Sequence, residues 1–216
     1  MGIFVNPSSA ECLYGGTFDP FHNGHEAICH HILAKTKSRE SVLRIIPCSQ
    51  PALKQQAQAS NLDRLAMLEK WRDTQPAASR ILIDDIEMIS DRISYTAETI
   101  IELKKQDVVP VKRIWVLGTD AFNSLSQWHQ VSTLVSTLNF WVINRAGEKE
   151  LNNKLGLTKL ASHSQLWSAA SGSFWFDQTI DMPVASSAIR QNINRQPVPV
   201  PKVIADYIEK HELYMA

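Results

Sequence analysis

The chain has 216 residues, which is enough for one α/β domain with a sizeable core. Its 22 basic and 22 acidic residues give a formal net charge of zero, which argues against the broad basic surface that DNA or RNA binding requires. Three scattered cysteines without a CxxC spacing, and no apolar run near the ~20 residues of a membrane span, predict a cytoplasmic protein with reduced thiols. We therefore expect neither nucleic acid nor a membrane as a partner.

Short apolar runs alternate with stretches of helical periodicity along the chain. This alternation predicts an α/β fold with a Rossmann-like, doubly wound and mainly parallel sheet. In such sheets ligands bind beyond the carboxyl ends of the strands, near a topological switch point. The predicted strands lie at residues 11–16, 41–47, 80–88, 113–118, 139–144 and 173–179.

We interpret residues 1–216 as a single domain, with a short N-terminal extension over 1–10 and a C-terminal helical part over 183–216. The polar stretch 146–156 is expected to be an exposed loop or a partly ordered helix. An oligomer is compatible with the sequence, but no pattern in it predicts one.

The most informative segment is GGTFDPFHNGH at residues 15–25, directly after the first apolar run. Gly15 and Gly16 let the backbone approach a ligand closely, or take φ values closed to other residues. Asp19-Pro20 predicts a turn, in which the aspartate can bond neighbouring backbone amides. The residues that follow have helical spacing, and the first turn of such a helix stabilises an anion.

Two histidines, His22 and His25, lie three residues apart across the start of this helix. Their imidazoles are expected to face one cavity and to donate hydrogen bonds to phosphate oxygens, with charge assistance where they are protonated. Two other interpretations remain. The pair could bind a metal, although no nearby cysteine or carboxylate cluster completes a ligand set, or the turn could be purely structural.

This segment resembles the signature of the nucleotidyltransferase superfamily, G-x-F-D-x-x-H-x-G-H. Five residues match the pattern: Phe18, Asp19, His22, Gly24 and His25. The resemblance implies the nucleotidyltransferase type of α/β fold, with a backbone cradle for the nucleotide. The residues implied to shape this cradle are Gly15, Gly16, Thr17 and Phe18.

Further segments resemble the nicotinate mononucleotide adenylyltransferases in particular. Lys54 and Arg64 match a lysine-bearing loop that precedes an arginine-bearing helix, but Ala52 and Leu53 replace the proline and histidine that are usual there. The string S-Y-T at residues 94–96 resembles the family string at the pyridine nucleotide, so Thr96 is implied to contact the substrate, with a helix cap as the structural alternative.

The segment 115–130 resembles the family string G-x-D followed by a tryptophan, matched by Gly118, Asp120 and Trp128. Asp120 can accept bonds from ribose hydroxyls, and Trp128 can stack on an aromatic ring or belong to the core. His129 stands where many relatives have tyrosine, which leaves recognition of the pyridine substituent open.

Two last matches concern the nucleotide. Arg145 resembles the arginine of the family's R-x-G string. Ser186, Ser187 and Arg190 resemble I-S-S-T-x-I-R, whose role in the superfamily is to hold the ATP triphosphate, although Ala185 replaces a serine there. A capped surface helix is the alternative.

The resemblance implies an adenylyltransferase of NAD biosynthesis that transfers AMP from ATP to nicotinate mononucleotide and releases deamido-NAD and pyrophosphate. Mg²⁺ is expected to accompany ATP, held chiefly by its phosphates and not by a protein cage. Catalytic roles are implied for His22, His25, Lys54 and Arg190. Alternatives are an enzyme that prefers or also accepts nicotinamide mononucleotide, a superfamily transferase for phosphopantetheine or a cytidine nucleotide, or a nucleotide-binding regulator with weakened turnover.

Overall fold

A parallel sheet forms the centre of the computed structural model, which describes residues 10–36, 41–53, 55–89, 92–144, 150–180, 184–193 and 198–215. Its seven strands follow the order β4-β2-β1-β6-β7-β9-β8, and every recorded pair is parallel. The strands are β1 Ala10–Gly16, β2 Val42–Pro47, β4 Ile81–Ile83, β6 Lys112–Gly118, β7 Asn139–Ile143, β8 Thr158–Lys159 and β9 Ser173–Asp177. Two further strands, β3 Gln50–Pro51 and β5 Ile93–Ser94, form a separate two-stranded sheet.

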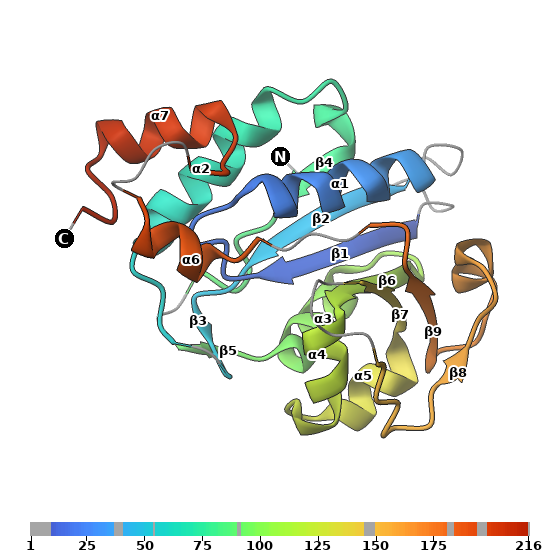
Figure 1. Cartoon of the computed structure of the whole chain (residues 1–216). Coiled ribbons are helices and arrows are strands. Elements are labelled where there is room, and N and C mark those ends of the chain that lie inside the picture. Colours follow the sequence, from blue (N-terminus) through green and yellow to red (C-terminus); the bar gives the residue numbers. More distant parts are fainter. Residues whose placement is uncertain are drawn as a thin grey trace.

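Helices cover both faces of the large sheet, as Figure 1 shows: α1, α2, α6 and α7 lie on one face, and α3, α4 and α5 lie on the other. The α-helices are α1 Asn23–Lys35, α2 Asn61–Asp73, α3 Thr96–Gln106, α4 Thr119–Ser124, α5 Val131–Thr137, α6 Ser186–Gln191 and α7 Lys202–Lys210. The described residues also contain three short 3-10 helices: η2 Ala78–Arg80, η3 Leu125–Gln127 and η4 His163–Trp167.

Alternating strand residues supply the two cores. Cys12 and Tyr14 of β1 belong to the cluster under α1, α2 and α7, whereas Leu13 belongs to the cluster under α3 and α4. This alternation follows from the two-residue period of a strand, and apolar side chains on both faces are typical of a strand buried between helical layers. The doubly wound α/β prediction is confirmed.

All six apolar runs contain a strand, but not always over their full length. Strand β4 ends at Ile83 although the run continues to Met88, because Asp84, Asp85 and Ile86 enter a turn in which the Asp84 carboxylate accepts a bond from the amide of Ile86. The strands β3, β5 and β8 were not predicted, since two residues are too few to show a period. Residues 150–156 are extended or turn structure without a helix.

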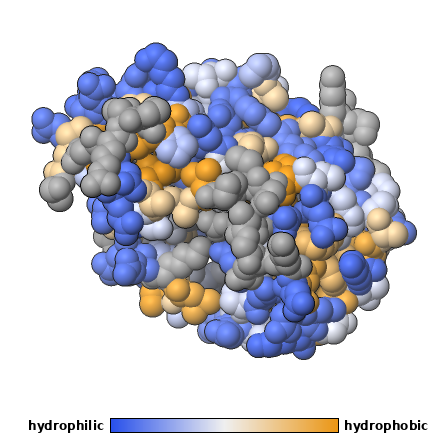
Figure 2. Space-filling model, viewed as in Figure 1, coloured by the Kyte–Doolittle hydropathy of each residue, from blue (hydrophilic) through white to orange (hydrophobic). Residues whose placement is uncertain are grey.

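The surface shown in Figure 2 is mainly hydrophilic, with hydrophobic areas that are separated from one another. Isolated apolar side chains on a surface are normal in water-exposed domains. Within the described residues, none of the helices combines the length and the hydropathy that a bilayer crossing requires.

A buried ion network ties the amino-terminal halves of the three central strands together. Glu11 of β1 is 1% exposed and accepts bonds from Arg44 of β2 at 2.6 Å and from Arg113 of β6 at 2.9 Å. Arg44 also pairs with Asp84, and Arg113 with Asp107. Burial alone would lower the pKa of both arginines, but these carboxylates outweigh it and raise the pKa.

The switch point of the topology lies between β1 and β6. The chain adds β2 and β4 on one side of β1, then crosses to the other side and adds β6, β7 and β9. The carboxyl ends of β1 and β6 are therefore adjacent, and the connections that follow them leave toward opposite faces of the sheet. This is where open α/β sheets bind their ligands.

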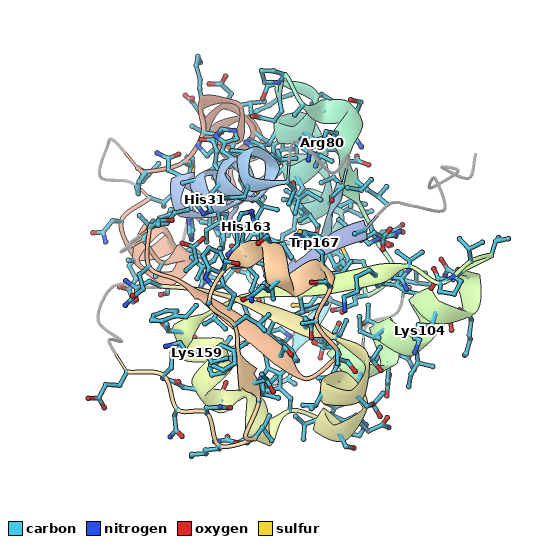
Figure 3. The ribbon with its side chains drawn as sticks, turned by 90° about the vertical axis from the view of Figure 1, so that its right-hand side faces the viewer. His31, Arg80, Lys104, Lys159, His163 and Trp167 are labelled. Atoms are coloured by element: carbon cyan, nitrogen blue, oxygen red, sulfur yellow. The ribbon has the colours of Figure 1, made fainter. Side chains whose placement is uncertain are left out.

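A second buried carboxylate joins α1 to β9. The Asp177 side chain is fully buried and lies 2.7 Å from His31 Nε2, and it also accepts bonds from Trp141 Nε1 at 3.1 Å and from Thr179. Figure 3 shows His31 on α1 in the region where η4 carries His163 and Trp167. Burial alone would raise the pKa of Asp177, but the bonds from His31 and Thr179 outweigh it and hold the pKa well below its usual range.

The replacement Asp177→Asn tests this tie through the pH dependence of stability. Because the pKa in the folded state lies below the usual aspartate value of about 3.9, the carboxylate stabilises the fold above that pH and loses this effect as the pH falls further. We expect the difference in unfolding free energy between wild type and Asp177→Asn to shrink below about pH 4 in urea titrations. Replacement of the exposed Asp206 by asparagine serves as the control. A difference in unfolding free energy between wild type and Asp177→Asn that stays constant with pH would contradict the assignment.

Candidate active site

A cavity opens to solvent at the carboxyl ends of β1, β6 and β7. Counted together with the open solvent at its mouth, it has a volume of about 410 Å³. The start of α1 and the segment before α6 complete its wall. Its lining residues are Tyr14, His22, Gly24, His25, Ile28, Gly118, Ile143, Asn144 and Val184. Both predicted histidines and the predicted Gly118 therefore meet in one cavity at the switch point.

The two histidines cap the helix on which they stand. The His25 amide donates to Nδ1 of His22 over 3.2 Å, and the His22 amide donates to Nδ1 of His25 over 3.3 Å. The rings stack with their centroids 3.6 Å apart and 16° between their planes. Gly24 permits this arrangement, because a Cβ on it would lie 3.0 Å from the His22 ring.

This reciprocal cap fixes the chemistry of the rings. An Nδ1 atom that accepts a backbone N–H carries no proton, so each neutral ring has its N–H at Nε2. Protonating either Nδ1 would break a cap bond. In its neutral form each ring therefore donates through Nε2.

The helix start offers fewer backbone donors than the sequence suggested. The Asn23 amide bonds to the carbonyl of Pro199 at 2.9 Å, and the His25 amide bonds to the His22 ring. Both of these first-turn amides therefore already have protein acceptors, and anion binding at this helix stays a prediction.

The structure gives a steric reason for glycine at positions 15 and 16 that the sequence did not predict. Neither Gly15 nor Gly16 has a positive φ, and a Cβ on Gly15 would lie 2.7 Å from the Trp115 ring, whereas one on Gly16 would lie 3.0 Å from the Phe18 ring. Bulk at these positions would thus collide with aromatic side chains of the protein. The two glycines let those rings pack against β1, and their part in a nucleotide cradle stays a prediction.

The turn after β1 is built around Phe18 and Asp19. Phe18 has a φ of 50°, a left-handed conformation that is uncommon for a bulky residue, and its ring is buried in edge contact with His25 at 4.9 Å. The predicted turn at Asp19-Pro20 is present, with a cis peptide bond. Thr17 accepts a bond from Arg64 through its carbonyl oxygen.

The Asp19 carboxylate is 2% exposed, and its partners come from distant segments instead of the neighbouring amides that we expected. It accepts bonds from the amides of Gln58 at 2.8 Å and Ala59 at 3.1 Å, and from the Tyr214 hydroxyl at 2.8 Å. Arg190 Nη1 lies 3.4 Å from the carboxylate and donates to the Asp19 carbonyl oxygen at 2.6 Å. One side chain thus connects four parts of the chain.

The two predicted anion sites are in contact. Ser186 at the start of α6 donates to the carbonyl of Pro20 at 3.1 Å, one residue from the Arg190 contact with Asp19. Val184, just before α6, lines the same cavity as the histidines. Ser187 is exposed, and Ala185 provides no side-chain cap to the helix.

Arg64 of α2 is fully buried and bonds to the backbone of the turn that follows β1. It donates to the carbonyl oxygens of Thr17 at 2.6 Å, Cys48 at 2.7 Å and Ser49 at 3.1 Å, and to Asn61 Oδ1 at 2.6 Å. Burial lowers the pKa of its guanidinium. The arginine that matched the family pattern therefore joins the ends of β1 and β2 to α2.

The segments predicted for the pyridine nucleotide lie next to each other. The Tyr95 and His129 rings are 4.4 Å apart, which brings the start of α3 against the turn after η3. Thr96 begins α3, and the structural alternative of a side-chain cap is not found: Tyr95 stands at the cap position without a side-chain cap bond, and Ser94 accepts a bond from the amide of Ser49. Trp128 is half-buried against the α3–α4 core.

The remaining predictions have mixed outcomes. Asp120 lies in the first turn of α4, two residues after Gly118. The described residues that line the cavity do not include Asp120, Thr96 or Trp128. Lys54 and Arg145 lie outside the described residues. The roles assigned to the site residues stay predictions.

The sequence reasoning missed four cavity residues: Tyr14, Ile28, Asn144 and Val184. Two of them carried a usable signal. Tyr14 immediately precedes the glycines, and Asn144 ends an apolar run, so both stand where ligands of parallel sheets bind. Ile28 and Val184 are ordinary apolar residues, and only the assembled fold reveals their position.

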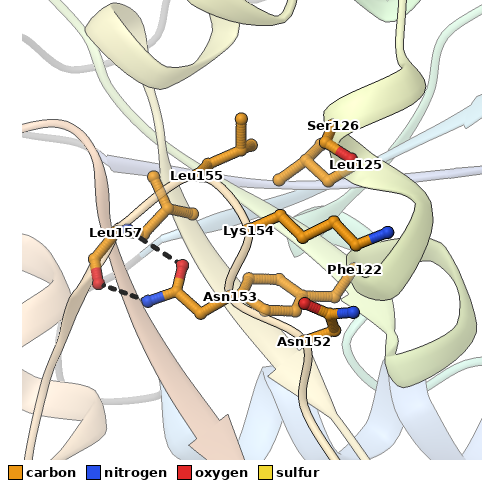
Figure 4. Close-up of a pocket in the computed structure, with 8 residues that line it drawn as sticks. All are labelled: Phe122, Leu125, Ser126, Asn152, Asn153, Lys154, Leu155 and Leu157. Atoms are coloured by element: carbon orange, nitrogen blue, oxygen red, sulfur yellow. Dashed lines mark hydrogen bonds between the residues drawn. The ribbon is translucent and has the colours of Figure 1, made fainter.

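A second, smaller hollow of about 170 Å³ lies between α4, η3 and residues 152–157, as Figure 4 shows. Asn153 closes a turn there through two bonds to the backbone of Leu157, both 2.9 Å long. Of its lining residues only Lys154 is ionisable, and none was predicted as a site residue. Among the described residues, no three His, Cys, Asp or Glu side chains gather as a metal-binding group.

Comparison with known proteins supplies independent information. A family model described as cytidylyltransferase-like matches residues 13–192. The chain is 32% identical over 212 residues to a probable nicotinate-nucleotide adenylyltransferase of Hahella chejuensis, covering 94% of this chain and 95% of the relative. It is 30% identical over 213 residues to the protein of the same name from Coxiella burnetii, covering 94% and 96%.

Solved structures agree on the fold. The nicotinic acid mononucleotide adenylyltransferase of Plasmodium falciparum, complexed with NaAD, aligns with a TM-score of 0.72 at 19% identity over 96% of this chain and 98% of that one. A structure of the same protein complexed with APC gives 0.70 at 18% identity over the same shares.

The replacement Arg64→Met tests whether this arginine supports the turn. It removes buried donors from three carbonyl groups while keeping much of the side-chain volume, so we expect the unfolding free energy to fall by about 3 kcal/mol. Arg72→Met on the same helix is the matched control, because within the described part of the chain the Arg72 side chain pairs with its neighbour Asp73 alone. Urea unfolding measures both, and equal losses would contradict the assignment.

Proposed function

Because the chain belongs to the cytidylyltransferase-like family, and within it to the nicotinate-nucleotide adenylyltransferases, we propose that it transfers AMP from ATP to nicotinate mononucleotide in NAD biosynthesis. The observation that carries the proposal is a single cavity at the switch point, in which the His22–His25 pair meets the start of the segment that leads to Ser186 and Arg190.

The reaction needs no protein nucleophile. An oxygen of the mononucleotide 5′-phosphate attacks the α-phosphorus of ATP, the bond from that phosphorus to the bridging oxygen breaks, and pyrophosphate leaves with the electron pair. The products are deamido-NAD and pyrophosphate. A protein accelerates such a transfer by aligning the attacking and leaving oxygens and by stabilising the charge that spreads over the phosphoryl oxygens.

The site residues suit this task. In the neutral form of the rings, the Nε2–H groups of His22 and His25 are donors at the solvent-open cavity, and the reciprocal cap holds both rings in place before any ligand binds. We assign them to the α-phosphate. Arg190 and Ser186, which touch the same turn, are assigned to the triphosphate together with Ser187 and Lys54. Gly118, Asp120 and Arg145 are assigned to the nucleotide, and Thr96 and Trp128 to the pyridine mononucleotide.

Mg²⁺ enters this proposal as part of the substrate. ATP carries the ion on its own phosphates, and Mg²⁺ keeps several water ligands when it binds to proteins. No described group of three acidic, histidine or cysteine side chains provides a competing cage. The ion would neutralise the leaving pyrophosphate, and the residues of this chain would orient the triphosphate around it.

Nicotinate mononucleotide is the preferred acceptor in the proposal because the relatives above carry that substrate in their names. The Tyr95 and His129 rings are in tilted contact, and His129 stands in the acceptor region where many relatives have tyrosine. Nicotinamide mononucleotide therefore remains the competitor that an experiment must include.

The proposal is tested by pyrophosphate release from MgATP with nicotinate mononucleotide and nicotinamide mononucleotide in parallel, with chromatography of the dinucleotide product. We expect release that depends on nicotinate mononucleotide and yields deamido-NAD. Equal rates with both acceptors would show dual specificity. ATP binding without release in the presence of either acceptor would instead indicate a nucleotide-binding regulator and contradict the proposal.

A single replacement tests the role of the histidine pair. His25→Ala removes one neutral donor from the α-phosphate and one cap bond from α1, so we expect kcat to fall by about 100-fold or more. His30→Ala on the exposed side of the same helix is the matched control, since His30 bonds only to Gln75 in the described structure. Near-normal turnover of His25→Ala, or equal losses in both variants, would reject the role.

A further inference from the structure

The C-terminal segment reaches into the turn that follows β1. Tyr214 donates its hydroxyl to Oδ1 of Asp19 at 2.8 Å, across 195 positions of sequence. The ring of Tyr214 packs against the core beneath α1 and α2. Neither the signature pattern nor the helical periodicity of the C-terminal part predicts this contact.

The chain reverses twice to make the contact. After α7, the amide of Leu213 bonds back to the carbonyl of Ile208 at 3.0 Å, and Glu212 has a φ of 51°, which is the Schellman ending of a helix. Tyr214 follows with a φ of 64°. Left-handed conformations are uncommon for residues other than glycine, so the surrounding contacts must hold both of them.

The carboxylate that receives this bond also faces Arg190. Three donors other than the arginine serve Asp19: the amides of Gln58 and Ala59, and the Tyr214 hydroxyl. Arg190 Nη1 lies 3.4 Å from Oδ2 and bonds at 2.6 Å to the main-chain oxygen of the same residue. The charge of Asp19 and a phosphate of the nucleotide would therefore compete for one guanidinium.

We propose that Tyr214 is a positioning residue for the triphosphate: its hydroxyl shares the charge of Asp19, so that Arg190 can turn from Asp19 to a phosphate. The step rests on the proposed function, because it assigns Arg190 to ATP. When Arg190 moves, the hydroxyl and the two amides continue to satisfy the buried carboxylate. Without the hydroxyl, Asp19 holds the arginine more strongly and ATP binds more weakly.

The protonation state of Tyr214 agrees with this role. Burial raises the pKa of the phenol, and the neighbouring Asp19 raises it further. The hydroxyl therefore keeps its proton throughout the working range of an enzyme and always acts as the donor.

Tyr214→Phe removes the hydroxyl and keeps the ring. We expect the KM for ATP and the Kd for ATP to rise about fivefold, with the KM for the mononucleotide changing by less than about twofold. The Kd is measured by equilibrium dialysis without acceptor, so it does not require turnover.

Tyr207→Phe is the matched control. Tyr207 also lies in the C-terminal part and donates its hydroxyl to a carboxylate, Asp63 Oδ1 at 3.1 Å, but that carboxylate does not face Arg190. We expect its ATP constants to equal those of wild type, with a change in melting temperature similar to that of Tyr214→Phe. Weakened ATP binding in both variants, or in neither, would overturn the proposal.

A double variant tests whether the effect passes through Asp19. An Asp19→Asn background has no carboxylate charge to share, so adding Tyr214→Phe should leave the Kd for ATP unchanged. If Tyr214→Phe still raises this Kd about fivefold in that background, Tyr214 acts through packing alone and the proposal is wrong. The proposed function is contradicted, independently of the role of Tyr214, if wild type binds ATP but releases no pyrophosphate. A wild type that does not bind ATP contradicts both.

Discussion

The buried carboxylate of Asp19 is the constraint on which the site depends. A buried carboxylate that is 2% exposed needs hydrogen-bond donors or a cation beside it. The donors come from the loop before α2 and from the C-terminal segment, and the cation is Arg190 of α6, which also bonds to the main-chain oxygen of Asp19. The need to satisfy one aspartate therefore brings residues 58–59, 190 and 214 to the end of β1. Val184, just before the helix that carries Arg190, lines the cavity at the switch point.

Local patterns in the sequence predict much of this fold. The apolar runs of β1 and β6 and the helical spacing after His25 depend on neighbouring residues, so they can be seen without a structure. The motif of residues 15–25 also places both histidines at the start of α1, as observed. Such a motif identifies residues but does not predict which other residues they contact.

The partners are the part that the sequence could not predict. Arg64 fits a helix with the family arginine, but its burial and its three carbonyl acceptors follow from the packing of α2 against the ends of β1 and β2. Trp115 likewise explains Gly15 only after β6 lies beside β1. Such contacts join positions far apart in the chain, and no local spacing encodes them. The pyridine-nucleotide segments are brought together, while their contacts with a ligand stay predictions.

The mutual cap of His22 and His25 has a consequence for observing this protein in solution. Each of the two amide hydrogens is shielded from solvent by the ring of the other residue, so the rate at which it exchanges with deuterium follows the departure of that ring. Most active sites lack a backbone signal that follows the ring atoms themselves. Here the main chain at the head of α1 acts as an intrinsic reporter on both imidazoles.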